Sequence, residues 1–282
     1  MPELPEVETV VRQIAPGLLG RRIEALHLHT PKLIRCQTVP TEALLGARFT
    51  AVTRRGKFIR CDLEPRDRAA PSLTILVHLK MTGRLTVLAG RPPRDRHDHI
   101  DLVLDRGLLR FRDVRKFGGW WLVPTADLLR LTPLGDLGPE PLAIARTAFR
   151  RLLAESGQRI KALLLDQTRL AGMGNIYCDE SLFAARIHPT TRAADIPSVK
   201  ADALWRHLRR ILRLAIRRQG STISSFVTPE GRSGGYQKEF QVYGRDGQPC
   251  PACGRTLQRL IVAGRGTTAC PRCQPLPRHR RL

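Results

Sequence analysis

The pattern of apolar positions predicts one helix at the start of the chain and a long β region after it. Apolar residues recur at helical spacing over residues 4–18, and Pro16-Gly17 and Gly20 are expected to end this helix. Residues 22–123 instead contain short apolar runs separated by turn signals, which favours a sandwich or barrel. The candidate strands are Arg22–Leu28, Arg48–Thr53, Lys57–Leu63, Leu73–Leu79, Arg84–Leu88, Ile100–Leu104, Leu108–Arg112 and Trp120–Val123.

The second half of the chain has the spacing of helices, after a segment rich in Pro, Gly and Leu that is typical of a linker. Helices are predicted at 143–155, 159–166, 174–186 and 198–219. The pattern divides the chain into an N-terminal β domain (2–123), a linker (124–142), a helical domain (143–239) that includes a long loop (221–238), a cysteine module (240–275) and a basic tail (276–282).

The segment 198–219 has one apolar face, and arginines cover the rest of its surface. A solvated face is the more common meaning of such a pattern, and direct contact with DNA is the alternative. The arginines are Arg206, Arg209, Arg210, Arg213, Arg217 and Arg218.

Charge changes the picture, because the 282 residues contain 48 Lys and Arg against 25 Asp and Glu, a formal net charge of +23. Such a charge favours a polyanionic partner, since basic side chains release counterions from phosphates. A ribosomal or chromatin-like binder without chemistry fits the charge as well as an enzyme does. The acidic start does not resemble a secretory signal, and no apolar run reaches the roughly 20 residues of a membrane span. We therefore expect a cytoplasmic protein.

Four of the seven cysteines form two C-x-x-C pairs near the end of the chain. Pairs at this spacing are typical of a tetrahedral thiolate site for Zn²⁺, whereas a redox centre needs only one such pair. Four protein ligands leave no open coordination position, so we expect one structural zinc ion. Its predicted ligands are Cys250, Cys253, Cys270 and Cys273.

The N-terminus could carry chemistry. Pro2 is small enough for Met1 to be removed, which would expose a secondary amine, and α-amines titrate near pH 8. Such an amine could attack a sugar C1′ and form an iminium ion. Glu3 and Glu6 are three residues apart and could act beside it as an acid–base pair. The ordinary interpretation is that these acids only stabilise the positive end of the helix dipole.

Several short motifs follow one another along nearly the whole chain. They are Pro2-Glu-Leu-Pro-Glu-Val-Glu-Thr9, Arg55-Gly-Lys57, His78-Leu-Lys-Met81-Thr-Gly, His97-Asp-His-Ile-Asp, Asp113-Val-Arg115-Lys-Phe117-Gly, Leu137-Gly-Pro-Glu-Pro, Leu165-Asp-Gln-Thr, Gly172-Met-Gly-Asn175-Ile-Tyr, Phe240-Gln-Val-Tyr-Gly and the four cysteines. In these motifs and their order the chain resembles bacterial formamidopyrimidine-DNA glycosylase, also called 8-oxoguanine DNA glycosylase.

The resemblance implies an α+β fold of two lobes: a helix with a β-sandwich, then a helix–two-turn–helix domain with a zinc β-hairpin. It also implies a bifunctional enzyme of base-excision repair that acts on nucleoid DNA. Such an enzyme removes oxidised purines from duplex DNA and then nicks the strand, as a monomer without a nucleotide cofactor. The alternatives are an endonuclease VIII-like enzyme for oxidised pyrimidines and a non-catalytic DNA-damage-binding protein.

The family pattern also implies roles for the matching residues. Pro2 corresponds to the nucleophile, Glu3 to the general acid/base, and Glu6 to a group that stabilises the flipped nucleotide and the N-terminus. Lys57 corresponds to a hairpin lysine that contacts the phosphate beside the lesion and takes part in catalysis, and Arg265 to an arginine that holds the phosphates around the lesion and assists δ-elimination.

A second group of matching residues is expected to contact DNA. Met81, Arg115 and Phe117 correspond to side chains that fill the space left when the lesion is flipped out of the duplex. His97 is also expected to contact DNA, and the alternative for this residue is a structural role. The other expected DNA contacts are His78, Lys161 and Asn175, and the loop 221–238 corresponds to a lid over the flipped base.

Overall fold

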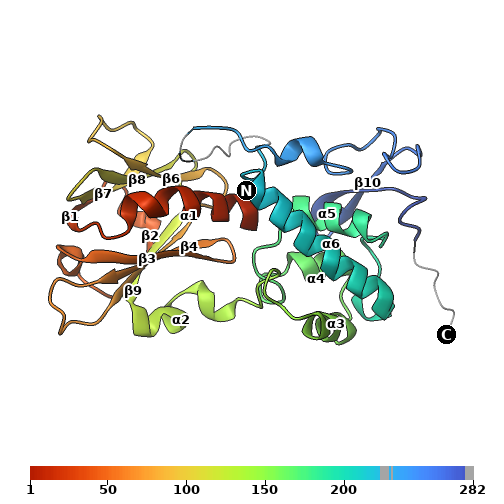
Figure 1. Ribbon diagram of the computed structural model, residues 1–282, viewed down its shortest axis with the longest axis horizontal. Coiled ribbons are helices and arrows are strands. Elements are labelled where there is room, and N and C mark those ends of the chain that lie inside the picture. The colour runs from red at the N-terminus through yellow and green to blue at the C-terminus, as the bar shows by residue number, and fades with distance from the viewer. Residues whose placement is uncertain (223–228, 230, 277–282) are drawn as a thin grey trace. The chain divides into compact units, whose positions relative to one another are not determined.

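The chain folds into two compact units in the computed structural model, which describes residues 1–222, 229 and 231–276 (Figure 1). The first unit contains Met1–Asp136 and Arg218–Gly235. The second contains Leu137–Arg217 and Tyr236–Leu282. The segment 218–235 thus groups with the β region, although the sequence pattern placed the loop 221–238 in the helical domain. Part of that loop (223–228 and 230) and the end of the basic tail (277–282) lie outside the described residues.

The first unit is a sandwich of two sheets with a helix against both. One sheet has the strand order β1-β7-β8-β6 and the other β2-β9-β5-β4-β3, and every pair is antiparallel except β2 with β9. Helix α1 (Leu4–Leu18) packs against β3 and β4 of one sheet and β6 of the other. The strands are β1 (Ile23–Leu28), β2 (Ile34–Gln37), β3 (Arg48–Arg55), β4 (Phe58–Glu64), β5 (Leu73–His78), β6 (Gly83–Leu88), β7 (Asp98–Leu104), β8 (Leu108–Asp113) and β9 (Gly119–Pro124).

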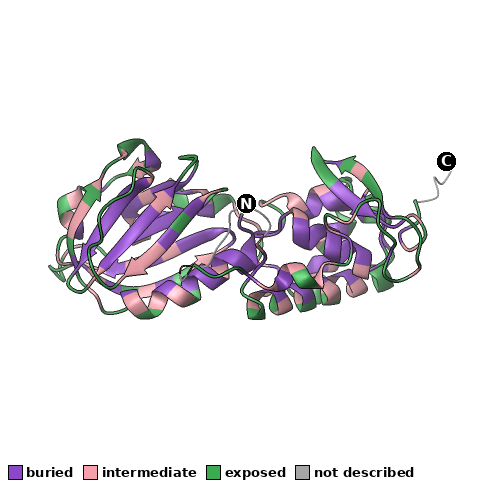
Figure 2. Ribbon diagram, turned by 90° about the horizontal axis from the view of Figure 1, so that it is seen from above, coloured by how far each residue is buried: buried purple, intermediate pink, exposed green. Residues whose placement is uncertain are grey.

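The core of this unit lies between the sheets, where the apolar faces of the strands meet the buried side of α1. Figure 2 shows buried residues concentrated along the strands and exposed residues in the loops that connect them. Phe111 on β8 and Trp120 on β9 are both fully buried, and their ring centroids are 5.8 Å apart. The two sheets therefore make contact through large interlocking side chains as well as through aliphatic ones.

The first helix spans Leu4–Leu18, as the sequence predicted, and the side chain of Leu18 is fully buried against the core. Two other local features differ from the sequence predictions. Strand β2 was not predicted, and its partly exposed residues give little pattern. The segment expected as a linker contains a short helix, α2 (Leu128–Leu131).

The second unit is helical and ends in a two-stranded hairpin. Its helices are α3 (Arg146–Ala154), α4 (Ile160–Leu165), α5 (Asn175–Ala184) and α6 (Ser198–Arg217), and its strands are β10 (Gln258–Val262) and β11 (Arg265–Ala269). Its short 3₁₀ turns are Ala193–Asp195 and Tyr236–Glu239, and those of the first unit are Pro31–Leu33, Thr41–Leu44, Thr125–Asp127 and Pro133–Asp136. Helix α6 packs against α3 and α5, and β11 packs against α5. Within the described part of the chain, no helix has both the length and the apolar composition needed to cross a membrane.

The α+β fold class predicted from the sequence is confirmed: a helix with a β-sandwich, a helical region and a four-cysteine hairpin. The predicted strands agree with the observed ones to within two residues at each end.

Truncation of Phe111 to alanine is expected to destabilise the first unit by about 3–5 kcal/mol, because it opens a cavity beside Trp120. Phe117 serves as the matched control, since this phenylalanine is 48% exposed. Phe117→Ala is expected to change the free energy of unfolding by less than about 1 kcal/mol. Urea denaturation followed by tryptophan fluorescence measures both, and equal losses would contradict the assigned core.

Candidate active site and nucleic-acid interface

The start of α1 holds the residues expected to carry the chemistry. Pro2 is buried and directly precedes Glu3, the N-cap residue of α1. The backbone N–H of Glu3 donates to Oε2 of Glu6 over 2.9 Å, so the first turn is closed by its own carboxylate. Both glutamates are almost fully buried. The structure therefore brings Pro2, Glu3 and Glu6 together, as the sequence predicted for an N-terminal acid–base site.

Glu6 also joins this turn to a distant segment of the same unit. Its Oε1 accepts the backbone N–H of Ser221 over 2.8 Å and the Ser221 hydroxyl over 3.1 Å. Gly220 makes the approach possible, because its φ is +76° and a Cβ there would lie 2.8 Å from Cγ of Glu6. One carboxylate thus fixes both the beginning of α1 and the residues that open the loop 221–238.

Backbone contacts close the base of this loop. The N–H of Gly235 donates to the carbonyl of Arg218 over 2.8 Å, and the N–H of Gly234 donates to the Thr222 hydroxyl over 2.9 Å. A Cβ on Gly234 would lie 2.4 Å from the carbonyl oxygen of Gly220. The loop therefore leaves and re-enters the fold through a narrow neck, residues 218–222 and 234–235, that Glu6 anchors.

Lys57 lies in the two-residue turn between β3 and β4, where Gly56 has a φ of +56°. Arg54 holds this turn against α1: its Nε pairs with Oε2 of Glu8 at 3.1 Å, and its guanidinium donates to the carbonyl of Gly56 over 2.9 Å. Only 6% of Lys57 is exposed. The hairpin prediction is correct, and a salt bridge that was not predicted fixes the hairpin beside the first helix.

His78 ends β5 next to the Lys57 hairpin, because it pairs with Phe58 across the sheet. Burial, Lys80 and Lys57 together lower the pKa of His78 to about 3, so its imidazole is neutral at physiological pH. Nδ1 accepts the backbone N–H of Lys80 over 2.9 Å. A neutral ring with Nδ1 as acceptor carries its proton on Nε2, which suits it to donate to a phosphate oxygen.

The three residues expected to fill the emptied base stack meet on the surface of the first unit. Met81 lies between β5 and β6, and Arg115 and Phe117 lie between β8 and β9. The Arg115 guanidinium stacks on the Phe117 ring at 4.5 Å from its centroid and donates to Sδ of Met81 over 3.2 Å. All three are exposed. They form one contiguous, exposed group outside the core.

A buried aspartate that was given no role from the sequence supports this group. Asp113 accepts hydrogen bonds from the Thr82 hydroxyl in one loop and from the backbone N–H groups of Arg115 and Gly118 in the other. Asp113 is fully buried. Its carboxylate thus ties the Met81 loop to the Arg115 loop.

His97 lies just before β7. It is partly buried, its backbone N–H donates to Asp95, and its Nε2 accepts from Arg96 over 3.1 Å. Its carbonyl accepts the backbone N–H of Asp113 over 3.0 Å, so His97 lies beside the aspartate that holds the Met81 group.

In the second unit, Lys161 is fully buried, so the expected direct contact with DNA is wrong for this structure. Its ammonium pairs with Asp179 at 2.6 Å and donates to the Thr267 hydroxyl over 2.6 Å and the Gly266 carbonyl over 3.4 Å. Burial raises the pKa of Asp179 to about 6 despite this lysine. The pair fastens β11 to α4 and α5.

Asn175 and Arg265 are brought to the same hairpin. Asn175 is the first residue of α5, after the N-cap Gly174, and its side-chain amide donates to the carbonyl of Gly266 over 2.8 Å. Arg265 is exposed and follows a turn in which Ala263 and Gly264 both have positive φ. Buried contacts hold the hairpin, and Arg265 extends from it.

The four cysteines converge as a metal site. Their Sγ atoms all lie within 4.8 Å of one another, with Cys250 and Cys273 at 3.9 Å and Cys253 and Cys270 at 3.5 Å. A tetrahedral zinc ion with Zn–S bonds of about 2.3 Å places its sulfurs roughly 3.7 Å apart, so the donor set fits Zn²⁺. The metal would hold the two knuckles together and leave no position for catalysis.

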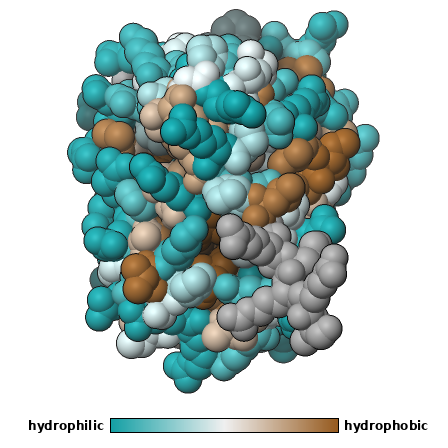
Figure 3. All heavy atoms as spheres, turned by 90° about the vertical axis from the view of Figure 1, so that its right-hand side faces the viewer, coloured by the Kyte–Doolittle hydropathy of each residue, from teal (hydrophilic) through white to brown (hydrophobic). Residues whose placement is uncertain are grey.

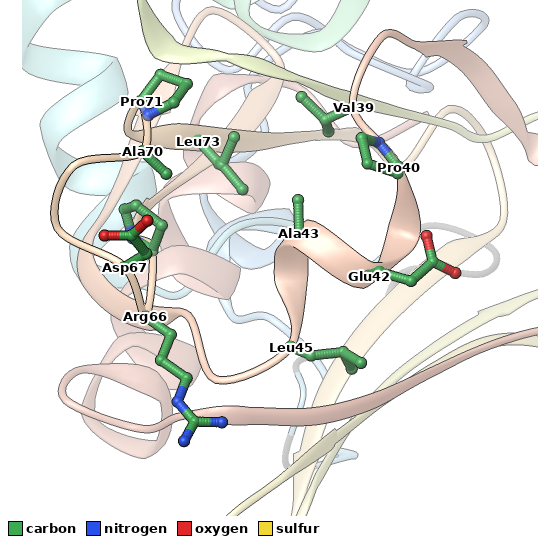
Figure 4. A pocket seen from close by; sticks show the side chains of 11 residues that line it. Val39, Pro40, Glu42, Ala43, Leu45, Arg66, Asp67, Ala70, Pro71 and Leu73 are labelled. Carbon is green, nitrogen blue, oxygen red and sulfur yellow. The ribbon is translucent and has the colours of Figure 1, made fainter.

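A mostly apolar pocket of about 630 Å³ also occurs in the first unit (Figure 4). It lies between the Thr41–Leu44 turn and the loop after β4, and Glu42, Arg66 and Asp67 are its charged residues. None of the expected site residues lines it. Glu64 ends β4 beside this pocket, whereas the Lys57 hairpin precedes the other end of that strand. The pocket is therefore separate from the chemistry.

The four-cysteine hairpin and the strongly basic chain identify the class of protein, which is a zinc-finger protein that binds nucleic acid. Family models for the formamidopyrimidine-DNA glycosylase N-terminal domain, its H2TH domain and the zinc finger found in FPG and IleRS match residues 1–120, 137–227 and 247–276. The chain belongs to the formamidopyrimidine-DNA glycosylase family. The resemblance inferred from its motifs and the structural zinc site are both confirmed.

Individual relatives extend over the whole chain. A formamidopyrimidine-DNA glycosylase of Desulforamulus reducens is 42% identical over 280 residues, which cover 97% of this chain and 99% of the relative. The MutM (Fpg) structure from Thermus thermophilus is 41% identical with a TM-score of 0.84, covering 97% of this chain and 98% of that one. The Lactococcus lactis Fpg in complex with abasic-site DNA is 36% identical with a TM-score of 0.86, covering 97% and 99%.

Replacement of Lys161 by methionine is expected to destabilise the second unit by about 3–5 kcal/mol, because it leaves a buried aspartate without its partner. Lys161→Met combined with Asp179→Asn is expected to recover most of this loss. Arg130, which is 71% exposed in its ion pair with Asp127, provides the control, and Arg130→Met should cost less than about 1 kcal/mol. Urea denaturation of the zinc-loaded protein measures all three, and a double variant no more stable than Lys161→Met would contradict the ion-pair interpretation.

His78 is expected to make the protein less stable as the pH falls. Its pKa is about 3 in the folded chain and near 6.5 when unfolded, so between these values the unfolded state binds the extra proton. The contribution of the neutral imidazole to the free energy of unfolding is therefore lost as the pH falls from 6.5 towards 3, at about 1.4 kcal/mol per pH unit. His78→Asn should remove this slope from the unfolding free energy measured between pH 7 and 4. Parallel curves for the variant and the parent protein would show that the imidazole is not held neutral.

Proposed function

We propose that this chain removes oxidised purines, 8-oxoguanine and formamidopyrimidines, from duplex DNA and then nicks the strand by β,δ-elimination. Membership of the family makes it a DNA glycosylase of base-excision repair with an associated lyase activity, and DNA its partner. The observation that carries the mechanism is the buried group of Pro2, Glu3 and Glu6 at the start of α1.

The reaction begins at the Pro2 nitrogen once Met1 has been removed. That nitrogen attacks C1′ of the damaged nucleotide and loses its proton, the bond between C1′ and the base breaks, and the base leaves with the bonding electrons and a proton. The C1′–O4′ bond then breaks, O4′ takes a proton, and the nitrogen lone pair forms an iminium ion with C1′. The iminium ion acidifies the 2′ hydrogen, so the C3′–O bond breaks in β-elimination and the C5′–O bond in δ-elimination. Glu3, adjacent in the chain, is the group that gives and takes these protons.

The surrounding residues position the DNA. Lys57 in the turn before β4 and the Nε2–H of His78 at the end of the neighbouring strand β5 are suited to one phosphate beside the lesion. Met81, Arg115 and Phe117 fill the space that the flipped nucleotide leaves, with Arg115 facing the orphaned base. Arg265 on the zinc hairpin and Asn175 at the start of α5 hold further phosphates, and Lys161 positions that hairpin without contacting DNA.

The remaining assignments follow from this function. The loop 221–238 covers the flipped base, and its neck is anchored by Glu6. The enzyme acts as a monomer on nucleoid DNA in the bacterial cytoplasm, without a nucleotide cofactor and without a membrane. His97 has a DNA-contacting role at the edge of the first unit.

Borohydride trapping on an 8-oxoguanine:C duplex tests the nucleophile. We expect a covalent protein–DNA complex that disappears in Pro2→Gly and when Met1 is retained, because both remove the proline amine. Lys32→Met is the matched control and should still form the complex, since Lys32 is exposed and lies outside the expected site. A complex that persisted when Met1 was retained would contradict the assignment of the Pro2 amine as the nucleophile.

A thymine-glycol duplex run in parallel tests the substrate class. We expect the 8-oxoguanine strand to be cleaved preferentially. Preference for thymine glycol would support an oxidised-pyrimidine enzyme instead, and binding of either duplex without cleavage would support a non-catalytic damage-binding protein.

A further inference from the structure

The outer face of α6 has a concentration of charge that the proposed chemistry does not use. One side of this helix is buried against α3 and α5 through Leu204, Leu208 and Leu212. The other side carries what we call the arginine stripe, formed by Arg206, Arg209, Arg210, Arg213 and Arg217. Arg206 and Arg217 are eleven positions apart, so the stripe is about 16 Å long.

The stripe lines a shallow hollow. A depression of about 290 Å³ is bounded by the five arginines and Trp205, and no acidic side chain lines it. The Arg209 guanidinium stacks on the Trp205 ring at 4.7 Å, and the indole N–H donates to the carbonyl of Ile144 over 3.0 Å. The ring is thus fixed by the fold, and it holds one arginine in place before any partner arrives.

The charge of the stripe is not neutralised by acids of the described chain. Within residues 1–222, 229 and 231–276, none of its five arginines forms an ion pair with a carboxylate. Asp202, the only acidic residue of α6, is occupied by Arg150 and by Arg146 at 3.6 Å, both outside the stripe. The cations also disfavour one another, since desolvation and Arg213 lower the pKa of Arg209, and desolvation, Arg210 and Arg206 lower that of His207. Binding of a polyanion relieves this repulsion.

The geometry favours a nucleic acid over a membrane. A helix that binds a bilayer inserts its apolar face, but the apolar face of α6 is already part of the core. Guanidinium groups match phosphate in bidentate fashion, and a duplex presents about one phosphate for each 1.7 Å of its axis. Figure 3 views one end of the second unit and shows a mostly hydrophilic surface with small apolar patches.

We propose that the arginine stripe is a second DNA-binding surface that takes the backbone phosphates of undamaged duplex DNA, independently of the lesion. Its role is to hold the protein on DNA where there is no base to excise. This goes beyond the proposed excision chemistry, because the stripe contains none of the residues assigned to it.

The test compares two triple variants of the full-length, zinc-loaded protein. Arg206→Gln, Arg210→Gln and Arg213→Gln remove three charges from the stripe. Arg68→Gln, Arg91→Gln and Arg106→Gln remove the same charge from exposed loops of the first unit. Binding to an undamaged duplex of about 40 base pairs is measured as a function of NaCl concentration. Each phosphate contact contributes about 0.9 to the slope of log K against log[NaCl], so the stripe variant should lose about 2–3 from its slope and the control less than about 1.

Further measurements separate the possible causes of a smaller slope in the stripe variant. Arg→Lys at the three stripe positions should keep most of the slope, which excludes misfolding as the reason for the loss. Nicking of a short 8-oxoguanine duplex at saturating enzyme should stay within about twofold in the stripe variant, so its failure would be distinguishable from failure of the excision mechanism. Equal slopes in the two glutamine variants would overturn the proposal. So would a stripe variant that loses binding to vesicles of anionic lipid but keeps its binding to duplex DNA.

Discussion

The buried carboxylate of Glu6 is the constraint on which the active-site half of the molecule depends. It accepts hydrogen bonds from Glu3 at the start of α1 and from Ser221 at the neck of a loop more than two hundred residues later. A carboxylate buried in this way is stable only when its oxygens are satisfied by donors. Gly220 is required beside it, because any Cβ would occupy the place of the Glu6 side chain. Pro2, the proposed nucleophile, and the neck of the loop are therefore positioned by one group.

Buried carboxylates also anchor the other two groups of proposed DNA-contacting residues. Asp113 is buried and holds the two loops that present Met81, Arg115 and Phe117. Asp179 is buried with Lys161 and holds the hairpin that presents Arg265. In each case an acidic side chain inside the fold fixes the backbone, and the exposed basic or apolar side chains that we propose to contact DNA extend from it. The protein thus combines a strongly positive surface with a small number of buried negative anchors.

Much of this could be predicted from the sequence, because helix and strand periodicity, turn glycines and cysteine spacing are local. The first helix, eight of the strands and the zinc ligands were found in this way, and the order of the motifs indicated the family. The anchors could not be found, since Glu6 and Ser221, or Lys161 and Asp179, are related only by the folded chain. Lys161 was misassigned for the same reason: its motif gives the position but not the burial. Strand β2 is short and half exposed, so it lacks a readable pattern.

The central claim is that Glu6 holds the Pro2 amine and the loop neck in their working positions. Glu6→Gln tests it most directly, because the amide is nearly the same size but turns an N–H group towards a backbone N–H. Single-turnover rates should be measured on two duplexes, one with 8-oxoguanine and one with a preformed abasic site. Loss of one buried hydrogen bond costs about 1–3 kcal/mol, so we expect the rate on both duplexes to fall by about 5- to 150-fold while the protein stays folded. Parent-like rates on both duplexes would contradict the claim.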